Sequence, residues 1–416
     1  MKCINKNTSF VFFYMFVFFL GCMAYGDKKA PSVNAKAAII IDADTGCVIY
    51  EKNADKKFYP ASITKILTGY LGIVQGGDRK KKITVSRKAA WGITPGSSSI
   101  SLKPGEIVAL KDVLYGLMLR SANECGNVIA EHISGSNSGF ALLMNKTAKE
   151  WGLKNTNFVN PHGLHKDKHK STARDMAIIA KHAMENEVFR KIIKTRYYAF
   201  PDTNKHKGVE RGKMTNKNKM LHPHNDAYYK YCIGIKAGYT KRSLHTFVAA
   251  AEKNGHMVIV SLMKVSDKKR MYSDLKNLME YGLEQFEERT LINKGDMVES
   301  KKFKYTSGVV ELVAKDTLKK DLPKQCKDIE KRELFQKIKF PVHEGDVLGE
   351  ISFFIKDSKI GSIPVIASNT VVSVFSWHYI KGLIFSIPVF VGIGLIITLY
   401  LFYLGSKTPR NRSRYR

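Results

Sequence analysis

The chain has 416 residues, 44% of them hydrophobic, which is enough for two or three domains with sizeable cores. It carries 68 lysines and arginines against 37 aspartates and glutamates, a formal net charge of +31. The basic residues are spread along the chain and form no zinc-finger, RNA-recognition or basic-zipper pattern, so we predict no nucleic-acid partner. In an exported protein this charge favours anionic membrane lipids or cell-wall polymers as partners.

The first 26 residues have the pattern of a secretory signal peptide. Two lysines precede an apolar run over residues 10–20, and Ala24-Tyr25-Gly26 supplies the small residues of a cleavage site. We therefore predict export, with the signal peptide at residues 1–26. The alternative is a lipoprotein signal that ends at Cys22, in which Phe19 is a poor fit.

A second membrane signal lies at the other end of the chain. Residues 382–405 contain no charged side chain and would span roughly 36 Å as a helix, enough to cross a bilayer. Five lysines and arginines follow this segment. We predict a transmembrane helix over residues 380–405 and a basic cytoplasmic tail over residues 406–416, because basic flanks stay inside. The two ends together predict a single-pass cell-membrane protein whose body lies outside the cytoplasm.

Between the predicted signal peptide and the predicted transmembrane helix, the spacing of the apolar residues changes twice. The first part has two predicted strands, the middle is predicted to be helical, and three strands and a final helix follow. The predicted strands are 37–42, 47–50, 234–240, 244–251 and 257–265. The predicted helices are one that opens at Ser62, where apolar residues at 63, 66, 67, 70 and 71 have helical spacing, and those at 107–119, 122–133, 140–151, 171–184 and 267–286. This order predicts an α/β (α+β) domain over residues 30–290, with an antiparallel sheet flanked by helices and interrupted by a helical insertion.

The region from residue 291 to residue 375 has a different pattern. Short apolar stretches alternate with glycine turns, and no long amphipathic helix is predicted, so we expect a small β-rich domain. It contains no pattern that indicates chemistry, and we interpret it as a spacer. The four cysteines of the exported chain have no C-x-x-C spacing, so zinc is not expected and their disulfide state stays open.

The start of the first long helix carries a chemical pattern. In Ser62-Ile63-Thr64-Lys65 the hydroxyl and the amine are three residues apart, so they share one face of a helix. A neutral lysine there could take the serine proton, and the free N–H groups of the first turn would favour developing negative charge. Other Ser-x-x-Lys matches occur in this chain, and the alternative is a helix start with a solvated lysine.

Two further short patterns lie later in the chain. Ser121-Ala122-Asn123 lies at a helix junction, where it could equally be a helix cap, and Lys236-Ala237-Gly238 lies on a predicted strand. Each pattern is weak alone. Their order, spacing and structural context together resemble the serine active-site penicillin-binding proteins, and among them the D-alanyl-D-alanine carboxypeptidases.

The resemblance extends beyond these three motifs. The segments 42–46, 160–164 and 171–176 are similar to family sequences, and the likeness covers roughly residues 30–375. It implies a β-lactamase/transpeptidase-like catalytic domain and a serine-type carboxypeptidase. The implied enzyme removes the terminal D-Ala from peptidoglycan stem pentapeptides through an acyl-enzyme, and β-lactam antibiotics would acylate the same serine.

The resemblance also implies a role for each motif residue. Ser62 is the expected nucleophile and Lys65 the expected base, with Ser121 relaying a proton. Asn123 is expected to hold Lys65 and the substrate amide, and Lys236 to bind the terminal carboxylate. The same resemblance assigns the backbone N–H groups of Ser62 and Tyr239 to the oxyanion hole, with Gly238 allowing close approach of the substrate.

One position departs from the family pattern. Family members usually carry threonine where this chain has Ala237, and that hydroxyl ordinarily donates to the substrate carboxylate. Such a bond is worth about 1.5–3 kcal/mol, so its loss predicts an enzyme weakened roughly tenfold to a hundredfold. Arg270 is a candidate for a second carboxylate contact.

Two other functions and a metal site were weighed against this one. A β-lactamase of class A would need a Glu-x-x-Leu-Asn motif in the helical region, and the sequence has none there. A catalytically degenerate wall-binding or scaffold protein is the alternative that Ala237 favours. The histidines at 162, 165 and 169 are interpreted as structural, and neither a metal nor another cofactor is expected.

Overall fold

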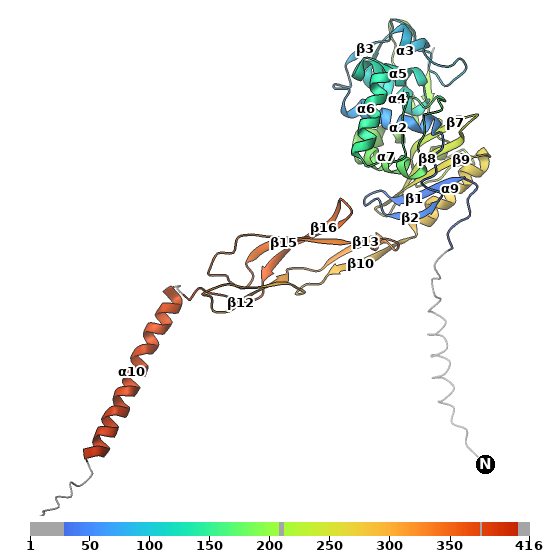
Figure 1. The fold of residues 1–416 in the computed structure, drawn as a ribbon. Coiled ribbons are helices and arrows are strands. Elements are labelled where there is room, and N and C mark those ends of the chain that lie inside the picture. Colours follow the sequence, from blue (N-terminus) through green and yellow to red (C-terminus); the bar gives the residue numbers. More distant parts are fainter. Residues whose placement is uncertain (1–28, 208–211, 375–376, 407–416) are drawn as a thin grey trace, which may run out of the picture. The chain divides into compact units, whose positions relative to one another are not determined.

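The computed structural model describes residues 29–207, 212–374 and 377–406 (Figure 1). The described chain forms two compact units. The first holds the residues up to Phe286 together with Pro323–Gln325, and the second holds Glu287–Leu322 and the residues from Cys326 onward. The predicted signal peptide and the predicted basic tail beyond Ser406 lie outside the described residues.

A five-stranded antiparallel sheet forms the centre of the first unit. Its strand order is β2-β1-β9-β8-β7, so the two strands from the start of the chain join three strands from the end of the unit. The strands are β1 (Ala37–Asp42), β2 (Val48–Lys52), β7 (Cys232–Thr240), β8 (Leu244–Lys253) and β9 (His256–Val265). The prediction of one antiparallel sheet interrupted by a helical insertion is confirmed.

The insertion consists of seven α-helices with short connecting elements. The α-helices are α2 (Lys65–Val74), α3 (Arg87–Trp91), α4 (Leu110–Leu119), α5 (Asn123–Ser134), α6 (Asn137–Glu150), α7 (Ala173–Glu185) and α8 (Glu187–Lys194). The connecting elements are η1 (Ala61–Thr64), η3 (Lys219–Leu221), and the strand pairs β3 (Lys82–Thr84) with β4 (Ile107–Ala109) and β5 (Tyr197–Ala199) with β6 (Lys213–Thr215).

Most predicted helices are present, and two differences have physical causes. The helix predicted over residues 107–119 begins only at Leu110, because Ile107–Ala109 pairs with β3. Helix α8 was not predicted. It begins at Glu187, and the side chain of Asn186 accepts a hydrogen bond from the backbone N–H of Phe189 as an N-cap.

Both faces of the central sheet are buried, which explains the unbroken apolar sequence of β1. Ala38 and Ile40 belong to a core shared with α9 (Lys268–Leu283), while Ile39 and Ile41 belong to the core beneath the helical insertion. Alternate residues of a strand point to opposite faces, so one strand contributes to two cores. Figure 1 shows α9 on the opposite side of the sheet from α2 and α7. Strand β7 forms one edge of this sheet.

The second unit is built mainly of antiparallel strands. One sheet has the order β11-β12-β16-β15-β14, and β10 pairs with β13. The strands are β10 (Phe286–Ile292), β11 (Met297–Lys302), β12 (Val309–Ala314), β13 (Leu318–Pro323), β14 (Glu330–Phe335), β15 (Val347–Ile355) and β16 (Ser358–Ala367). The prediction of a β-rich region after the first domain is confirmed.

The last described element is helix α10 (Trp377–Ser406). Among the residues that the structure describes, no helix was found that is both long and apolar enough to cross a membrane. The transmembrane helix expected over residues 380–405 therefore stays a prediction.

Candidate active site

Ser62 lies in η1, a single 3-10 turn directly before α2. The chain turns sharply into η1 because Ala61 has a positive φ of 51°, which is uncommon for a residue with a side chain. The hydroxyl of Thr246 on β8 donates to the backbone carbonyl of Pro60 at 2.8 Å, which ties this turn to the sheet. Ser62 itself is half-buried between buried neighbours, so the turn presents its hydroxyl at the surface of a pocket.

Lys65 is the first residue of α2, and its side chain is completely buried. Its Nζ lies 3.0 Å from Oγ of Ser62, 2.7 Å from Oδ1 of Asn123 and 2.6 Å from the backbone carbonyl oxygen of His162. These partners come from three separate segments of the chain. The buried amine therefore has three defined hydrogen-bond partners, one of which is the Ser62 hydroxyl.

The surroundings of Lys65 favour its neutral form. Burial lowers the pKa of the Lys65 amine well below its ordinary value, and the nearby charge of Lys236 lowers that pKa further. The carboxylate of Glu124 acts in the opposite direction. The result is an amine that is deprotonated more easily than a lysine in solvent, as a general base requires.

Ser121 and Asn123 lie where α4 ends and α5 begins. Ser121 has a positive φ of 63°, and its side chain is buried at the wall of the pocket. Asn123 is the first residue of α5, and its backbone N–H donates to the carbonyl of Ser98 at 2.8 Å. The structure therefore brings the second motif to the same pocket as the first.

Strand β7 brings the third motif to the pocket. Lys236 is 4% exposed, and its Nζ donates to the backbone carbonyl of Ala237 at 2.8 Å. Burial, reinforced by the charge of Lys217, lowers the pKa of Lys236 to about 7. The side chain of Tyr239 is 56% exposed at the pocket rim.

Gly238 permits a close approach between β7 and the Ser62 turn. A Cβ atom at this position would lie 2.7 Å from the backbone nitrogen of Ser62 and 2.7 Å from Oγ1 of Thr246. Both distances are shorter than such contacts allow, so a larger residue would push the strand and the turn apart. The backbone N–H groups near Ser62 therefore sit against the strand without an intervening side chain.

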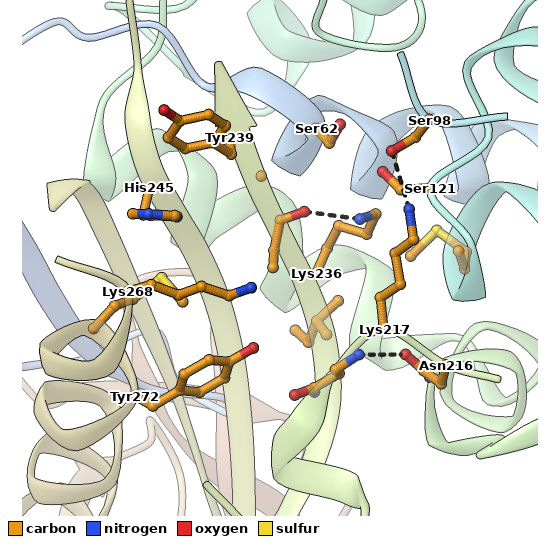
Figure 2. Close-up of a pocket in the computed structure, with 16 residues that line it drawn as sticks. Ser62, Ser98, Ser121, Asn216, Lys217, Lys236, Tyr239, His245, Lys268 and Tyr272 are labelled. Atoms are coloured by element: carbon orange, nitrogen blue, oxygen red, sulfur yellow. Dashed lines mark hydrogen bonds between the residues drawn. The ribbon is translucent and has the colours of Figure 1, made fainter. Parts of the chain in front are cut away.

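The pocket has a volume of about 290 Å³ and joins the helical insertion, β7 and α9 (Figure 2). Of the seven residues predicted for the site, Ser62, Ser121, Lys236, Gly238 and Tyr239 line it, whereas Lys65 and Asn123 lie behind its wall. Seven other polar residues line it that the sequence analysis did not find: Ser98, Asn216, Lys217, Asn218, His245, Lys268 and Tyr272. Arg270, the candidate for a second carboxylate contact, does not line the pocket and instead donates to Oδ1 of Asn34 at 3.2 Å.

Lys217 lies between β6 and η3, in a stretch for which no helix or strand is predicted from the sequence. Its Nζ donates to Oγ of Ser98 at 3.1 Å, and the adjacent Asn216 and Asn218 are buried. Figure 2 shows Lys217 and Ser98 across the pocket from Tyr239 and His245. No local sequence signal marked Lys217, because the burial of the two flanking asparagines is seen only in the structure.

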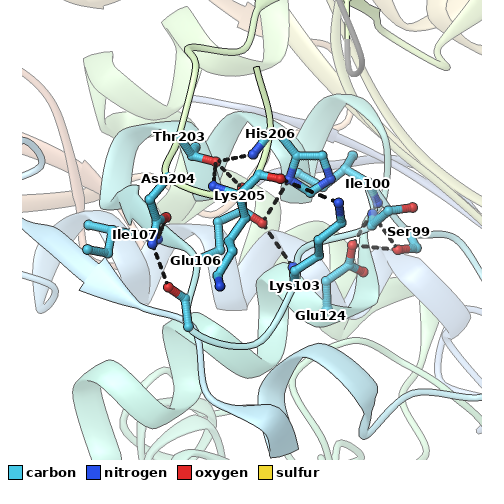
Figure 3. Close-up of polar contacts among 12 residues, drawn as sticks. Ser99, Ile100, Lys103, Glu106, Ile107, Glu124, Thr203, Asn204, Lys205 and His206 are labelled. Carbon is cyan, nitrogen blue, oxygen red and sulfur yellow. Dashed lines mark hydrogen bonds and ion pairs between the residues drawn. The ribbon is translucent and has the colours of Figure 1, made fainter. Parts of the chain in front are cut away.

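A buried carboxylate positions the loop that carries Ser98. Oε1 of Glu124 accepts hydrogen bonds from the hydroxyl of Ser99 and from the backbone N–H of Ile100, each at 2.6 Å (Figure 3). Glu124 follows Asn123 directly on α5 and is fully buried. One turn of α5 therefore holds both Lys65 and the loop at the pocket rim.

The histidines at 162 and 169 lie on the inner side of the site. The backbone carbonyl of His162 accepts from Lys65, as described above. Nδ1 of His169 accepts from the backbone N–H of Val159, so its Nε2 carries the hydrogen and donates to Oγ1 of Thr64 at 2.9 Å. Across the described parts of the chain, no group of three His, Cys, Asp or Glu side chains is arranged to hold a metal ion.

Comparison with known proteins agrees with this arrangement. Residues 25–267 match the sequence model of the peptidase S11 family, D-alanyl-D-alanine carboxypeptidase, and residues 286–373 match that of the C-terminal domain of penicillin-binding protein 5. The carboxypeptidase DacF of Bacillus subtilis is 32% identical over 345 residues, which cover 80% of this chain and 85% of the relative.

Solved structures give the same result. The crystal structure of penicillin-binding protein 5 from Haemophilus influenzae superposes with a TM-score of 0.61 at 28% identity, covering 83% of this chain and 100% of that one. The DD-transpeptidase of Streptomyces K15 superposes with a TM-score of 0.56 at 27% identity, covering 62% of this chain and 100% of its own.

The fold, the pocket and these similarities together define a serine peptidase. The chain belongs to the peptidase S11 family, the D-alanyl-D-alanine carboxypeptidases.

Proposed function

We propose that this protein removes the terminal D-Ala from peptidoglycan stem pentapeptides by acyl transfer through Ser62. The Ser62 oxygen attacks the carbonyl of the penultimate residue, D-Ala leaves as a free amino acid, and water hydrolyses the acyl-enzyme. The family assignment supports the substrate class. The contacts of Lys65 support the mechanism, and they are the observation on which the proposal rests most heavily.

The three partners of Lys65 fit a neutral amine. A neutral amine has two N–H groups and one lone pair. The two oxygens of Asn123 and His162, at 2.7 and 2.6 Å, are acceptors for its two N–H groups. If the amine is neutral, its lone pair is left for the third partner at 3.0 Å, and the Ser62 hydroxyl would then donate its proton to it. This arrangement prepares Lys65 to act as the general base.

The developing negative charge needs donors on the opposite side of the carbonyl carbon. We assign the backbone N–H groups of Ser62 and Tyr239 to this oxyanion hole. The close approach of Gly238 to the Ser62 nitrogen supports the assignment, because it sets the two backbone segments beside each other.

The remaining motif residues complete the cycle. Ser121, buried at the pocket wall, would pass the proton from Lys65 to the leaving amine. Asn123 would keep Lys65 oriented while its own amide N–H₂ remains available for the substrate. When Lys236 is protonated, its positive charge would attract the terminal carboxylate of the substrate. A β-lactam presents a carboxylate and a strained amide in a similar arrangement, so we propose that it acylates Ser62 as well.

The test uses the full chain in detergent with a fluorescent penicillin and with a stem pentapeptide ending in D-Ala-D-Ala. We expect stable labelling of the peptide that contains Ser62, release of D-Ala, and neither in the Ser62→Ala variant. Rapid turnover of the drug would favour a β-lactamase instead. A folded chain that neither labels nor releases D-Ala would contradict the proposal and favour a wall-binding or scaffold protein.

Ala237 is the observation that favours the scaffold alternative. We propose that the chain remains an enzyme, weakened because the alanine donates no hydrogen bond to the terminal carboxylate. The Ala237→Thr variant should acylate faster, by up to roughly tenfold to a hundredfold. An unchanged rate would show that the missing hydroxyl does not limit this enzyme.

We also propose that residues 1–26 direct export and that the uncharged segment 382–405 attaches the protein to the cell membrane, with the basic tail in the cytoplasm. Support comes from the sequence pattern at each end. The mature chain should begin at Asp27 and should resist extraction with alkaline carbonate, whereas a chain truncated after Val374 should be released. A full-length chain recovered in the soluble fraction would contradict the anchor.

A further inference from the structure

The pocket beside Ser62 is lined by cations without a balancing acid. Lys217, Lys236 and Lys268 all line it, and none of its lining residues is an aspartate or a glutamate. A concave site of one sign of charge concentrates ligands of the opposite sign. The pocket therefore favours an anionic group close to the reacting serine.

The three amines differ in what they contact. Lys236 donates to the carbonyl of Ala237, and Lys217 donates to the hydroxyl of Ser98. The amine of Lys268 makes no hydrogen bond or ion pair in the described part of the chain. Figure 2 shows its amine directed into the pocket, between His245 and Tyr272. Burial lowers the pKa values of Lys217 and His245, and the charge of Lys268 contributes to both shifts.

Lys268 is the first of three consecutive cations at the start of α9. The structure separates them: Lys268 lines the catalytic pocket, Lys269 lines a different hollow, and Arg270 donates to Asn34. The first turn of α9 contains no acidic residue, although cations are disfavoured at that end of a helix. Helix stability therefore does not explain the lysine at position 268.

Lys236 by itself is an incomplete anchor for a carboxylate. Burial lowers its pKa to about 7, so its positive charge is less firmly held at neutral pH than that of an ordinary lysine. The adjacent side chain, Ala237, has no donor. Lys268, by contrast, is an exposed lysine that lines the same pocket.

We propose that Lys268 binds the terminal carboxylate of the substrate, in place of the hydroxyl that is missing at Ala237. The inference rests on the proposed carboxypeptidase function and adds a specificity residue that lies outside the three motifs. It makes recognition of the free carboxylate dependent on an exposed charge, and hence sensitive to salt. It also means that the gain expected from Ala237→Thr is smaller than the loss of one hydrogen bond would suggest.

The experiment compares Lys268→Met with Lys269→Met in the full chain. Lys269 is the matched control, because it is the neighbouring exposed lysine and faces away from this pocket. We expect Lys268→Met to raise KM for the pentapeptide about fivefold with little change in kcat, the size typical of an exposed ion pair. Lys269→Met should leave both constants unchanged, and Lys268→Arg should restore KM.

Acylation by a penicillin and by its methyl ester distinguishes binding of the carboxylate from a general structural effect. Lys268→Met should slow acylation by the free acid and leave the ester unaffected, and the difference should shrink at high salt. In the Ala237→Thr background, Lys268→Met should slow acylation by the free acid less, because the threonine hydroxyl then supplies the missing donor.

The outcomes separate this inference from the proposed function. Equal effects of Lys268→Met on the acid and the ester, or equal KM values for the Lys268 and Lys269 variants, would overturn the role of Lys268 while D-Ala release continued. Absence of D-Ala release and of labelling in the unmodified chain would instead overturn the proposed function itself.

Discussion

The two units of the molecule differ in whether their charged side chains are buried. In the first unit Lys65, Glu106 and Glu124 are fully buried, and Glu106 pairs with His206 at 3.2 Å. In the second unit no described polar or charged side chain is buried. Its ion pairs lie at the surface, such as Lys331 with Glu333 at 2.8 Å, whose side chains are 41% and 31% exposed.

This difference has an energetic explanation. Burying a charged group costs free energy unless it is paired, hydrogen-bonded or neutralised. Lys65 fits the third case, because burial, reinforced by the charge of Lys236, lowers its pKa and so favours the neutral amine. The described part of the second unit has no buried charged side chain that needs a partner. Alternating apolar residues are therefore enough to form the cores of its sheets. Buried charge thus marks the part of the molecule where chemistry is expected.

The largest effect should come from removing the buried amine. Lys65→Met should reduce acylation of Ser62 by on the order of 10³-fold or more, because the serine loses its general base. Two buried acceptors also lose their donor, so the free energy of unfolding should fall by about 1–3 kcal/mol. Penicillin-labelling kinetics and urea unfolding measure the two effects. Acylation within tenfold of the unmodified rate would contradict a base at this position.

The next effect tests the close approach of β7 to the serine turn. Gly238→Ala should reduce acylation by on the order of 100-fold, because the added Cβ would lie 2.7 Å from the Ser62 nitrogen and displace the backbone donors. Far-ultraviolet circular dichroism should remain unchanged. Gly308→Ala in the second unit is a suitable control, since no atom lies within 4 Å of a Cβ built there.

A smaller effect is expected from pH. Lys236, with a pKa of about 7, is charged below that pH and becomes neutral above it. For substrates with a free carboxylate, kcat/KM should therefore fall as pH rises above about 7, at most tenfold for each pH unit. Lys65, the proposed base, must instead be neutral, so kcat/KM should also fall at low pH, where Lys65 becomes protonated. In Lys236→Arg the alkaline decline should disappear, and a profile identical to that of the unmodified chain would contradict this assignment.

The smallest effect is expected from the surface charges of the second unit. Lys331→Met should change the free energy of unfolding by no more than about 0.5 kcal/mol and should leave acylation unchanged. The same substitution in the first unit, Lys65→Met, is the contrasting case. A loss of activity in Lys331→Met would show that the second unit contributes to the reaction, contrary to the comparison above.

Local sequence patterns predicted much of the framework. The strands β1 and β7–β9 follow from apolar runs, and the helix carrying Lys65 follows from its apolar spacing. These features depend on residues close together in the chain. The order of the three motifs was likewise visible in the sequence, and the structure places all three at one pocket or directly behind its wall.

The tertiary structure decided what surrounds those motifs. It set the carbonyl of His162 against Lys65, used Glu124 to hold the Ser98 loop, and placed Lys217 across the pocket. Among three consecutive cations it directed Lys268 into the pocket and Arg270 away from it. Sequence alone identifies the groups that can react, because their types and spacing are local. Which further charges face them depends on contacts between distant segments, and the fold alone establishes those.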